Sequence, residues 1–382
     1  MRFTQTKQGN VIFIKGQYYI VNDLTFNLLK MYYEKKTVDE IAEALKTDAD
    51  QVQKLYNQIS EQLIEGKEYK DSIQFLQPLK VQWKITNRCN IRCKHCYEGE
   101  KNIQQLSDEQ INSIFEKLIN SNIQQLTITG GEALLVRNLS GYVCQCLEKG
   151  IMVNIFTNGI LLNSFVDELG DPVNKNLLTF EISIDGCKED HNYIRGQGNY
   201  EKTTANIMYA VSKGYKITTN TVVNRITKRH IVQMMKELRG MGVTNIQLSN
   251  LMLKGWAKEN EDELYISKEE LGEVYKEISE NIDFPFFYAD ITNTVYQADG
   301  TGKVKKEGVN TWKCCAGEAR ITIDFNGDVL LCPLCSDYTI GNLAEKSLKE
   351  IWDNPDRQVY IDKLISLNKG KQTCFIYGQD IK

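Results

Sequence analysis

The spacing of apolar residues divides the chain near residue 80. In the first part, short runs of alternating apolar and polar residues predict three strands, with Gly9 and Gly16 at the turns. Apolar residues then recur at helical spacing, which predicts three helices. The strands are expected at residues 2–7, 10–15 and 17–22, and the helices at residues 24–33, 37–45 and 48–64. A three-stranded sheet followed by three helices is a winged-helix-like arrangement, which we assign to residues 1–75.

From residue 81, apolar strands alternate with amphipathic helices. Six strands are expected at residues 81–86, 125–129, 152–157, 178–184, 216–223 and 245–251. The helices between them are expected at residues 108–119, 138–149, 162–169, 201–213 and 228–241, and a further amphipathic helix is expected at residues 267–280. This alternation predicts an α/β fold with a parallel sheet, which is either wrapped as an incomplete barrel or doubly wound. We assign residues 79–255 to a partial (β/α)6 TIM barrel.

Residues suited to chemistry follow these predicted strands at their carboxyl ends. They are, in chain order, Cys89, Cys93 and Cys96; Gly130, Gly131 and Glu132; Asn158; Ser183 and Asp185; and Ser249 and Asn250. The carboxyl ends of parallel strands meet at one edge of a sheet, where active sites of such folds are found. We therefore expect these residues to form a single site.

The three cysteines of the first motif lie within eight residues, from Cys89 to Cys96. Three thiolates at this spacing suit a cubane iron–sulfur cluster in which one iron has no protein ligand. Zinc is the alternative, with His95 as a fourth ligand. However, His95 lies between two of the cysteines, so its ring is poorly placed to reach the same metal. The spacing favours the cluster.

Composition excludes several classes of function. A net charge of −4 over 382 residues gives no reason to expect nucleic acid as a partner. The predicted helix at residues 48–64 carries Lys54 and little other positive charge, which argues against DNA binding by the first module. No export signal and no apolar run of membrane-spanning length is present, so we expect a cytoplasmic protein without a membrane partner. Eleven cysteines then favour metal or redox sites over disulfides.

The three cysteines followed by Gly130, Gly131 and Glu132 resemble the radical S-adenosylmethionine (SAM) superfamily over about residues 80–255. The resemblance implies a [4Fe–4S] cluster on the cysteines, whose open iron chelates the methionine part of SAM. An electron from a donor such as flavodoxin or ferredoxin would then release a 5′-deoxyadenosyl radical, which takes hydrogen from the substrate.

The same resemblance implies roles for other residues at the strand ends. Glu132 would help to bind the amino group of SAM, and the two glycines would let the backbone approach its methionine part. Ser183 and Arg195 would contact the carboxylate or the ribose, and Asn158 is included among the cofactor-binding residues. A surface ion pair is the alternative for Arg195, and a turn or cap at the strand end is the alternative for Asp185.

A second group of cysteines lies in the C-terminal part, which we assign to residues 306–382 after a bridging region at 256–305. Alternating runs on both sides of Asn326 and Gly327 predict a hairpin with a type I′ turn. The region resembles the SPASM domain of peptide-modifying radical enzymes, or its shorter twitch form. The resemblance implies one auxiliary [4Fe–4S] cluster, with Cys314 as a reserve ligand. Its four ligands would be Cys315, Cys332, Cys335 and Cys374. A structural zinc site is the alternative, because spacing alone does not choose the metal.

The first module resembles the peptide-chaperone domain of pyrroloquinoline quinone biosynthesis, through residues 21–24 and 37–42. That family binds the leader of a precursor peptide as an added strand. The three resemblances together imply a maturase of a ribosomally made peptide, which forms a thioether (sactionine-type) cross-link. Carbon–carbon or ether cross-linking and epimerisation are close alternatives. Epimerisation needs a hydrogen donor, usually a cysteine thiol, for which Cys187 and Cys314 are candidates. Sulfatase-type maturation and a non-catalytic iron–sulfur peptide-binding protein are weaker alternatives.

Overall fold

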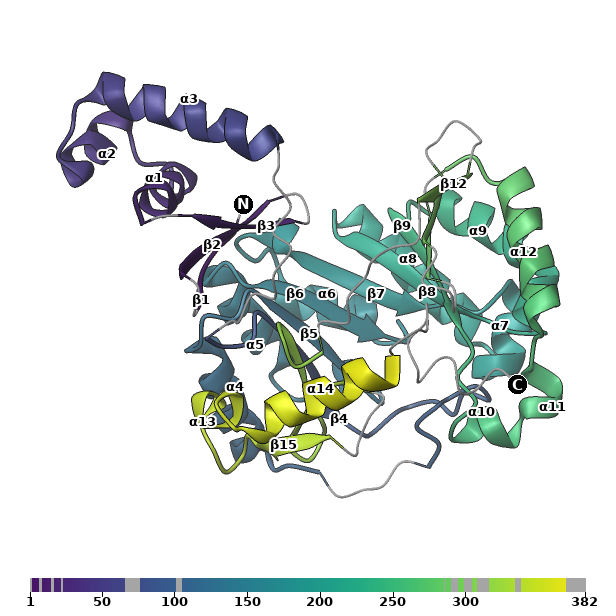
Figure 1. Cartoon of the computed structure of the whole chain (residues 1–382). Coiled ribbons are helices and arrows are strands. Elements are labelled where there is room, and N and C mark those ends of the chain that lie inside the picture. The colour runs from purple at the N-terminus through teal and green to yellow at the C-terminus, as the bar shows by residue number, and fades with distance from the viewer. Residues whose placement is uncertain are drawn as a thin grey trace. The chain divides into compact units, whose positions relative to one another are not determined.

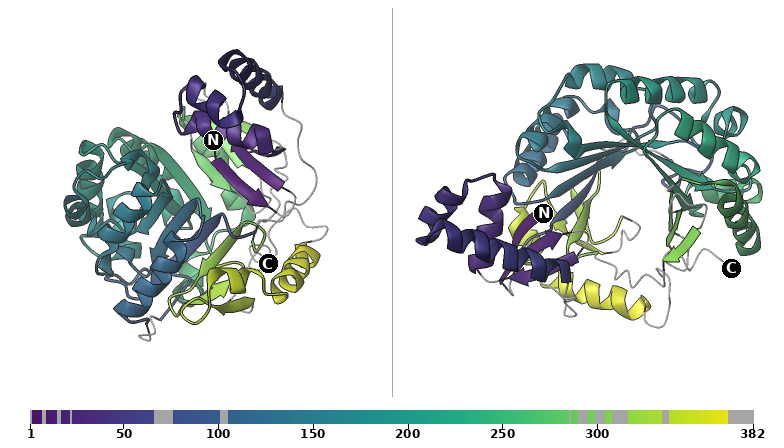
Figure 2. Two further views of the ribbon diagram at one scale, coloured as in Figure 1. Left: turned by 90° about the vertical axis from the view of Figure 1, so that its left-hand side faces the viewer. Right: turned by 90° about the horizontal axis from the view of Figure 1, so that it is seen from above.

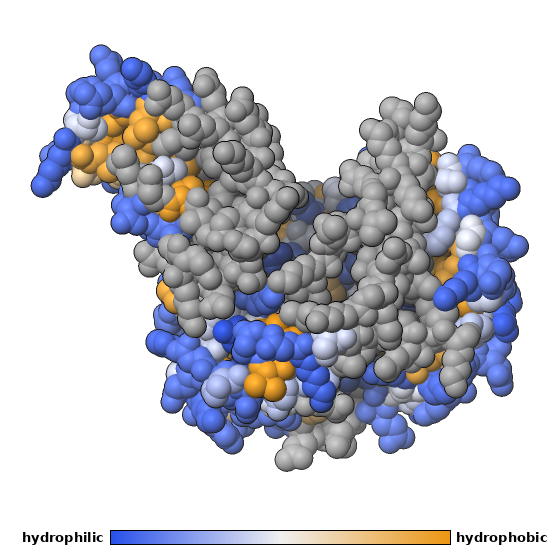
Figure 3. All heavy atoms as spheres, viewed as in Figure 1, coloured by the Kyte–Doolittle hydropathy of each residue, from blue (hydrophilic) through white to orange (hydrophobic). Residues whose placement is uncertain are grey.

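The computed structural model describes most of the chain, in two compact units, Met1–Leu79 and Lys80–Lys382 (Figure 1). The described residues are 2–6, 9–14, 17–21, 23–65, 76–100, 105–284, 286–289, 295–298, 304–307, 316–333 and 338–368. Within this part of the chain, no helix is long and apolar enough to cross a membrane. Hydrophilic side chains (blue) cover much of the described surface on the face drawn in Figure 3.

The first unit contains a three-stranded antiparallel sheet and three helices. Its strands are β1 (Arg2–Thr6), β2 (Gly9–Ile14) and β3 (Gln17–Val21), paired in that order. Its helices are α1 (Asp23–Tyr33), α2 (Val38–Leu45) and α3 (Ala49–Glu65). Thr37 and Glu40 form a capping box at the start of α2, and Ile12 of the sheet shares a buried core with Phe26 and Ile41 of the helices. These elements confirm the order and the approximate bounds predicted from the sequence.

The second unit is built on six parallel strands that lie side by side in chain order. They are β4 (Lys80–Thr86), β5 (Gln125–Gly130), β6 (Met152–Thr157), β7 (Leu178–Ser183), β8 (Lys216–Val223) and β9 (Asn245–Asn250). A doubly wound sheet would reverse its strand order at one point, and this order does not reverse. The sheet instead curves, with helices along its outer side (Figure 2), so the barrel prediction is confirmed.

The predicted helices of this unit are present, and several unpredicted helices accompany them. The predicted ones are α4 (Asp108–Ile119), α5 (Leu139–Glu148), α6 (Leu162–Leu169), α8 (Asn199–Ser212), α9 (Ile231–Gly240) and α12 (Lys268–Asn281). Not predicted were α7 (Lys188–Arg195), α10 (Trp256–Glu259), α11 (Glu261–Leu264) and the 3-10 helices Ala133–Leu135, Lys175–Leu177 and Thr227–His230. Most buried residues of α7 are polar, so an apolar pattern could not reveal it.

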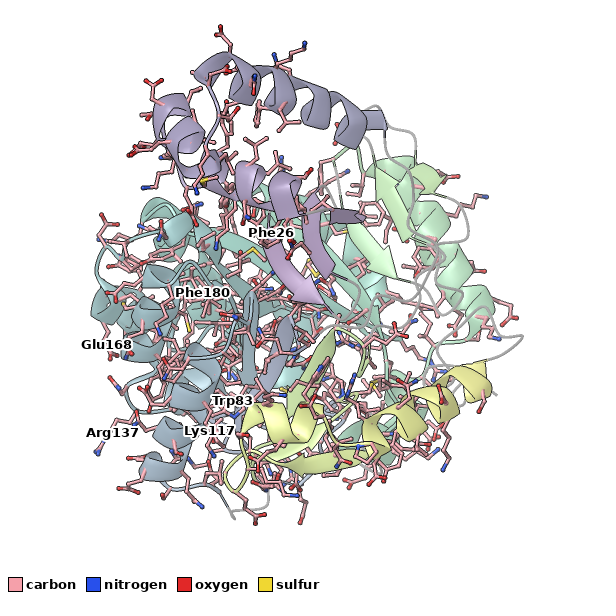
Figure 4. The ribbon with its side chains drawn as sticks, turned by 60° about the vertical axis from the view of Figure 1, so that its left-hand side comes forward. Phe26, Trp83, Lys117, Arg137, Glu168 and Phe180 are labelled. Atoms are coloured by element: carbon pink, nitrogen blue, oxygen red, sulfur yellow. The ribbon has the colours of Figure 1, made fainter. Side chains whose placement is uncertain are left out.

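Burial alternates along β7 and separates its two faces. Phe180 and Ile182 are fully buried on the face that the helices cover, and Phe180 packs edge-on against Phe165 of α6. Phe180 is labelled in Figure 4, together with Trp83, a fully buried side chain of β4. Glu181 and Ser183 alternate with these residues and point to the inner, concave face of the sheet.

The C-terminal hairpin continues the barrel sheet beyond β4. Its strands are β13 (Arg320–Ile323) and β14 (Asp328–Leu330), and β13 pairs with β4 in parallel. The strand β15 (Thr339–Asn342) and the helices α13 (Leu348–Trp352) and α14 (Asp356–Asn368) follow. At the other edge, β10 (Phe287–Ala289) pairs in parallel with β9, and β11 (Val295–Ala298) and β12 (Val304–Glu307) extend the sheet. The sequence did not predict that the hairpin joins the barrel.

The hairpin prediction is confirmed, but its type I′ turn is wrong. A type I′ turn needs a positive φ at both central residues. Gly327 has a φ of +89°, whereas Asn326 is not among the described non-glycine residues with positive φ. The Gly327 N–H donates to the Asp324 carbonyl at 2.9 Å, which closes the turn one residue earlier than predicted. The Asn326 side chain instead accepts a hydrogen bond from the Asp328 N–H at 3.1 Å.

Lys84 of β4 connects this hairpin to the loop after β4. This loop carries Cys89, Cys93 and Cys96 and is called the cysteine-containing loop. Its ammonium lies 2.5 Å from a carboxylate oxygen of Glu98 and 3.2 Å from one of Asp324, and 4.6 Å from the centre of the Phe325 ring. Lys84 is buried, so the two carboxylates compensate a charge that has little contact with water. One side chain thus joins the barrel, the loop after β4 and the hairpin turn.

We predict that Lys84→Met loosens the hairpin by about 1–2 kcal/mol, because two carboxylates lose a charged partner. Amide hydrogen exchange of residues 320–330, followed by mass spectrometry, should become faster. Lys349→Met is the matched control, because its ion pair with Asp353 lies on an exposed helix and is worth about 0.5 kcal/mol or less. Equal exchange in both variants would contradict the role of Lys84.

Candidate functional site

The three cysteines lie on the loop that follows β4, at the carboxyl edge of the sheet. Cys93 is buried, and Cys89 and Cys96 are partly exposed. None of the three forms a disulfide. The loop is held by groups from four other parts of the chain.

The end of β5 fixes the start of the loop through its backbone. The Gly131 N–H donates to the Thr86 carbonyl at 2.8 Å, and the Glu132 N–H donates to the Arg88 carbonyl at 2.7 Å. A Cβ on Gly131 would lie 2.2 Å from the Arg88 oxygen, and one on Gly130 would lie 2.6 Å from the Thr86 oxygen. Both positions therefore require glycine for contact with the chain's own backbone, in addition to any role toward a cofactor.

The carboxylate of Glu132 joins the ends of β5 and β6. It is almost fully buried and accepts hydrogen bonds from the Thr157 hydroxyl at 2.7 Å, the Asn158 N–H at 2.8 Å and the Leu134 N–H at 3.0 Å. Burial raises the pKa of Glu132, although these three donors act in the opposite direction. Two of the donors share Oε1 and one reaches Oε2, so Oε2 has capacity for one further donor.

Asn158 connects the end of β6 to the cysteine-containing loop. Its side-chain amide donates to the side-chain oxygen of Asn90 at 2.7 Å, next to Cys89 in the sequence. The Asn158 carbonyl in turn accepts a hydrogen bond from the Thr203 hydroxyl at 2.9 Å. Asn158 therefore acts on the loop as well as lying among the predicted cofactor contacts.

A buried ion pair lies on the other side of the loop. The Arg195 Nε donates to Asp185 Oδ2 at 2.5 Å, and the same oxygen lies 2.6 Å from His95 Nε2. Asp185 is fully buried and Arg195 is 7% exposed, so the alternative of a surface ion pair for Arg195 is wrong. The ring nitrogen of His191 accepts a hydrogen bond from the Asp185 N–H at 3.2 Å. Because His95 bonds Asp185, zinc binding by His95 is not supported.

The surroundings of Asp185 and Arg195 keep both side chains charged. Burial alone would raise the pKa of Asp185, but the Arg195 guanidinium and His95 hold that pKa well below its usual range. Burial also lowers the pKa of His191 to about 3, assisted by the positive charge of Arg195, so His191 is neutral. The result is a carboxylate and a guanidinium in direct contact beneath the cysteine-containing loop.

Arg195 also reaches the sulfur of Cys93. Its Nη1 donates toward Cys93 Sγ at 3.7 Å. Burial raises the pKa of the Cys93 thiol to about 12, and the charge of Arg195 acts against this rise. A metal ligand must be a thiolate, and a neighbouring guanidinium favours the thiolate. Arg195 is thus placed to support Cys93 as a ligand.

The far side of the loop is held by residues that the sequence did not single out. The Trp256 N–H donates to the Cys96 carbonyl at 2.9 Å, and the Lys94 N–H donates to the Ile194 carbonyl of α7 at 2.9 Å. A Cβ on Gly255 would lie 2.3 Å from the Gly99 nitrogen, so the two backbones touch there. Among these contacts, only Gly255 offers a signal in the sequence, because a glycine can mark a close approach of two backbones.

The remaining candidate residues are not all part of this network. Ser183 lies partly buried at the carboxyl end of β7, beside Asn220 in register. The Ser249 hydroxyl, at the end of β9, donates to the Asn220 side chain rather than to the loop. Cys332 is buried just after β14. The other candidate ligands of the auxiliary cluster lie outside the described residues; they are Cys314, Cys315, Cys335 and Cys374.

Three thiols on one loop, with a guanidinium beside one of them, form a donor set that suits an iron–sulfur cluster. The sequence also matches the radical SAM superfamily over residues 83–238 and the SPASM iron–sulfur cluster-binding domain over residues 314–375. The chain contains a radical SAM domain and an iron–sulfur cluster-binding SPASM domain. Its cofactors are accordingly SAM and iron–sulfur clusters.

Similarity to individual proteins is lower. Pre-heme d1 synthase of Dinoroseobacter shibae is 24% identical over 72% of this chain and 73% of its own length. The sporulation killing factor maturation protein SkfB of Bacillus subtilis is 24% identical over 72% of this chain, and the match spans 64% of SkfB.

The fold is also that of a solved structure. SuiB of Streptococcus suis, bound to SAM, has a TM-score of 0.69 at 15% identity, over 94% of this chain and 88% of that one. SuiB bound to its precursor peptide SuiA has a TM-score of 0.63 at 14% identity, over 98% and 92% of the two chains.

We predict that Gly131→Ala lowers the iron content of the reconstituted protein and costs about 1–3 kcal/mol, because the new methyl group displaces the Arg88 backbone. Iron is counted by colorimetric assay on the purified protein. Gly272→Ala is the control, since it lies in α12 with no atom within 4 Å of the added Cβ. Unchanged iron content in Gly131→Ala would show that the close contact is dispensable.

We also predict that Arg195→Met destabilises the cluster-free protein by about 3–5 kcal/mol, because Asp185 stays buried without its cation. The double variant Arg195→Met/Asp185→Asn should recover most of this loss. Thermal unfolding followed by circular dichroism measures both changes.

The pH dependence has a defined sign. A depressed pKa means that Asp185 stabilises the fold above its unfolded-state pKa of about 3.9 and loses this effect only as pH falls through the lower folded-state value. The wild-type protein should therefore remain more stable to unfolding than the double variant down to about pH 4. An advantage that disappears at higher pH would contradict the ion pair.

Proposed function

We propose that this protein is a maturase that modifies a ribosomally synthesised precursor peptide, with a thioether cross-link as the product. The observation that carries the proposal is the cysteine-containing loop, fixed at the carboxyl edge of the barrel with Arg195 against Cys93. When bound, the cluster and SAM supply a 5′-deoxyadenosyl radical that abstracts hydrogen. The chain's own residues must hold these groups and bring the peptide to them.

We assign the following roles to the residues of the site. Cys89, Cys93 and Cys96 are the cluster ligands. Glu132 accepts the ammonium of SAM at Oε2, which still has capacity for a donor. Ser183 lies on the inner face of β7, where it would meet the carboxylate or ribose. Arg195 holds Cys93 and Asp185, and its buried ion pair leaves it less free to bind the SAM carboxylate than the sequence suggested.

A peptide substrate is supported by the relatives and by the first unit. SkfB is named as a maturation protein, and the SuiB fold has been solved with a precursor peptide. In the first unit the strand order leaves β1 and β3 at the two edges of the sheet. An extended leader peptide would add to one of these edges and raise the concentration of its core segment near the site.

The C-terminal domain would carry one auxiliary [4Fe–4S] cluster on Cys315, Cys332, Cys335 and Cys374. Such a cluster would accept the remaining electron or ligate the substrate cysteine, which favours a thioether. The electron donor, flavodoxin or ferredoxin, and the cytoplasmic location stay predictions.

Epimerisation is the second candidate, on account of Cys187. This residue precedes α7 at the same edge of the barrel, and its thiol lies 3.8 Å from the His230 carbonyl oxygen. Burial raises the pKa of Cys187 to about 12, so it remains a thiol that can donate hydrogen. Product mass separates the two candidates, because epimerisation leaves the mass unchanged whereas a cross-link removes two hydrogens.

The test uses anaerobic, reconstituted protein with dithionite, SAM and the synthetic peptide encoded by a short neighbouring reading frame. We predict that 5′-deoxyadenosine forms and that the peptide loses two hydrogens with one cysteine thiol blocked to alkylation. The triple variant Cys89→Ala/Cys93→Ala/Cys96→Ala should yield neither product. Absence of 5′-deoxyadenosine from the wild-type protein would contradict the proposed function.

A further inference from the structure

A hydrogen-bonded row of polar side chains crosses the inner face of the barrel diagonally, from Ser249 at the carboxyl edge to Glu181 one layer further in. It contains Glu181 of β7, Asn220 of β8 and Ser249 of β9, one residue from each of three adjacent strands. The residues that flank Glu181 in β7, Phe180 and Ile182, are fully buried under the helices. Glu181 therefore points away from the helices and toward the concave side of the sheet.

The row is ordered by hydrogen bonds of fixed direction. The Ser249 hydroxyl donates to Asn220 Oδ1 at 2.9 Å, and Asn220 Nδ2 donates to Glu181 Oε1 at 3.3 Å. The side-chain oxygen of Asn220 thus accepts from Ser249, and the side-chain NH2 group of Asn220 donates to Glu181. At the end of the row, Glu181 Oε2 has no donor among the described residues. Glu181 Oε2 can therefore accept a hydrogen bond from a further group.

The environment of Glu181 differs from that of Glu132. Glu132 receives three donors, whereas Glu181 receives one long hydrogen bond and has no ion pair among the described residues. Burial raises the pKa of Glu181 to about 7, only partly offset by Asn220. A partly buried carboxylate with an unfilled acceptor is costly until a donor occupies it. The stability of the sheet does not require a carboxylate at position 181, so the side chain of Glu181 calls for another explanation.

The position of Glu181 relative to the proposed cofactor site indicates what would fill it. Ser183 lies two residues further along the same face, about 7 Å away, at the edge where SAM is expected. Glu181 is paired in register with Phe156 of β6 and Thr218 of β8. It therefore lies one layer of side chains further into the barrel than Ser183, where it would face a substrate that enters the concave side of the sheet.

We propose that Glu181, held by Asn220 and Ser249, binds an N–H donor of the precursor peptide's core segment and so positions the residue that is attacked. The donor is either a backbone amide or a cationic side chain, since both offer an N–H to a carboxylate oxygen. This inference rests on the proposed function and adds a specificity residue to it. Glu181 takes no part in holding the cluster or SAM.

The test is the Glu181→Gln variant of the full-length, reconstituted enzyme with the synthetic precursor peptide as the probe. The amide keeps the shape of the side chain but removes the charge. Loss of a charge-assisted hydrogen bond should raise the KM for the peptide roughly ten- to hundred-fold. Iron content and SAM binding, measured by equilibrium dialysis, should equal those of the wild-type protein.

Two further variants keep the test decisive if Glu181→Gln folds poorly. Ser249→Ala removes the start of the row without touching the carboxylate and should raise the KM by a smaller factor in the same direction. Glu168→Gln makes the same chemical change at an exposed carboxylate on α6, labelled in Figure 4, and should leave the KM unchanged.

The two possible sources of the donor are separated by peptide analogues. If a cationic side chain binds Glu181, replacing the lysines and arginines of the core by glutamine should raise the wild-type KM as much as Glu181→Gln does. If a backbone amide binds, this peptide should bind normally and N-methylation of the core should raise the KM instead.

A wild-type KM in Glu181→Gln would overturn the inference, as would a loss of SAM binding in that variant. Failure of the proposed function would look different, because the wild-type protein would then make no 5′-deoxyadenosine.

Discussion

The buried ion pair between Asp185 and Arg195 is the interaction on which the site depends. Two charges removed from water are tolerated only when they are paired and hydrogen-bonded, and here the pairing distance is 2.5 Å. Asp185 also bonds His95 of the cysteine-containing loop and the Val222 N–H of β8 at 2.9 Å. Arg195 reaches Cys93. One ion pair thereby fixes the loop, the end of β7 and the helix α7 to each other.

The sheet curves into a partial barrel with its strands in chain order. This arrangement brings together residues that are far apart in the sequence. Each strand ends at the same edge, and the segments that follow β5, β6 and β7 contact the cysteine-containing loop through Glu132, Asn158 and Arg195. The hairpin at β13 adds a further strand beside β4, and Lys84 connects it to the same loop. The position of the auxiliary domain therefore depends on the barrel sheet itself.

Much of the fold could be predicted from the sequence, because local signals were strong. Capping boxes at Ser107 and Ser267 mark the starts of α4 and α12, and strand bounds follow the apolar runs. The helix α7 was missed because its buried residues are polar, and the pairing of β13 with β4 joins residues far apart in the sequence. The chemistry of Cys89, Cys93 and Cys96 was visible from spacing, but the partner of Arg195 was not, since only the fold brings Asp185 to it.

We propose that a radical formed at the cysteine-containing loop takes hydrogen from a peptide. A precursor peptide that carries deuterium at the carbon positions of its core segment tests this transfer, with mass analysis of the 5′-deoxyadenosine formed. We expect 5′-deoxyadenosine to acquire deuterium in proportion to the peptide modified. Modified peptide accompanied by 5′-deoxyadenosine without deuterium would contradict it.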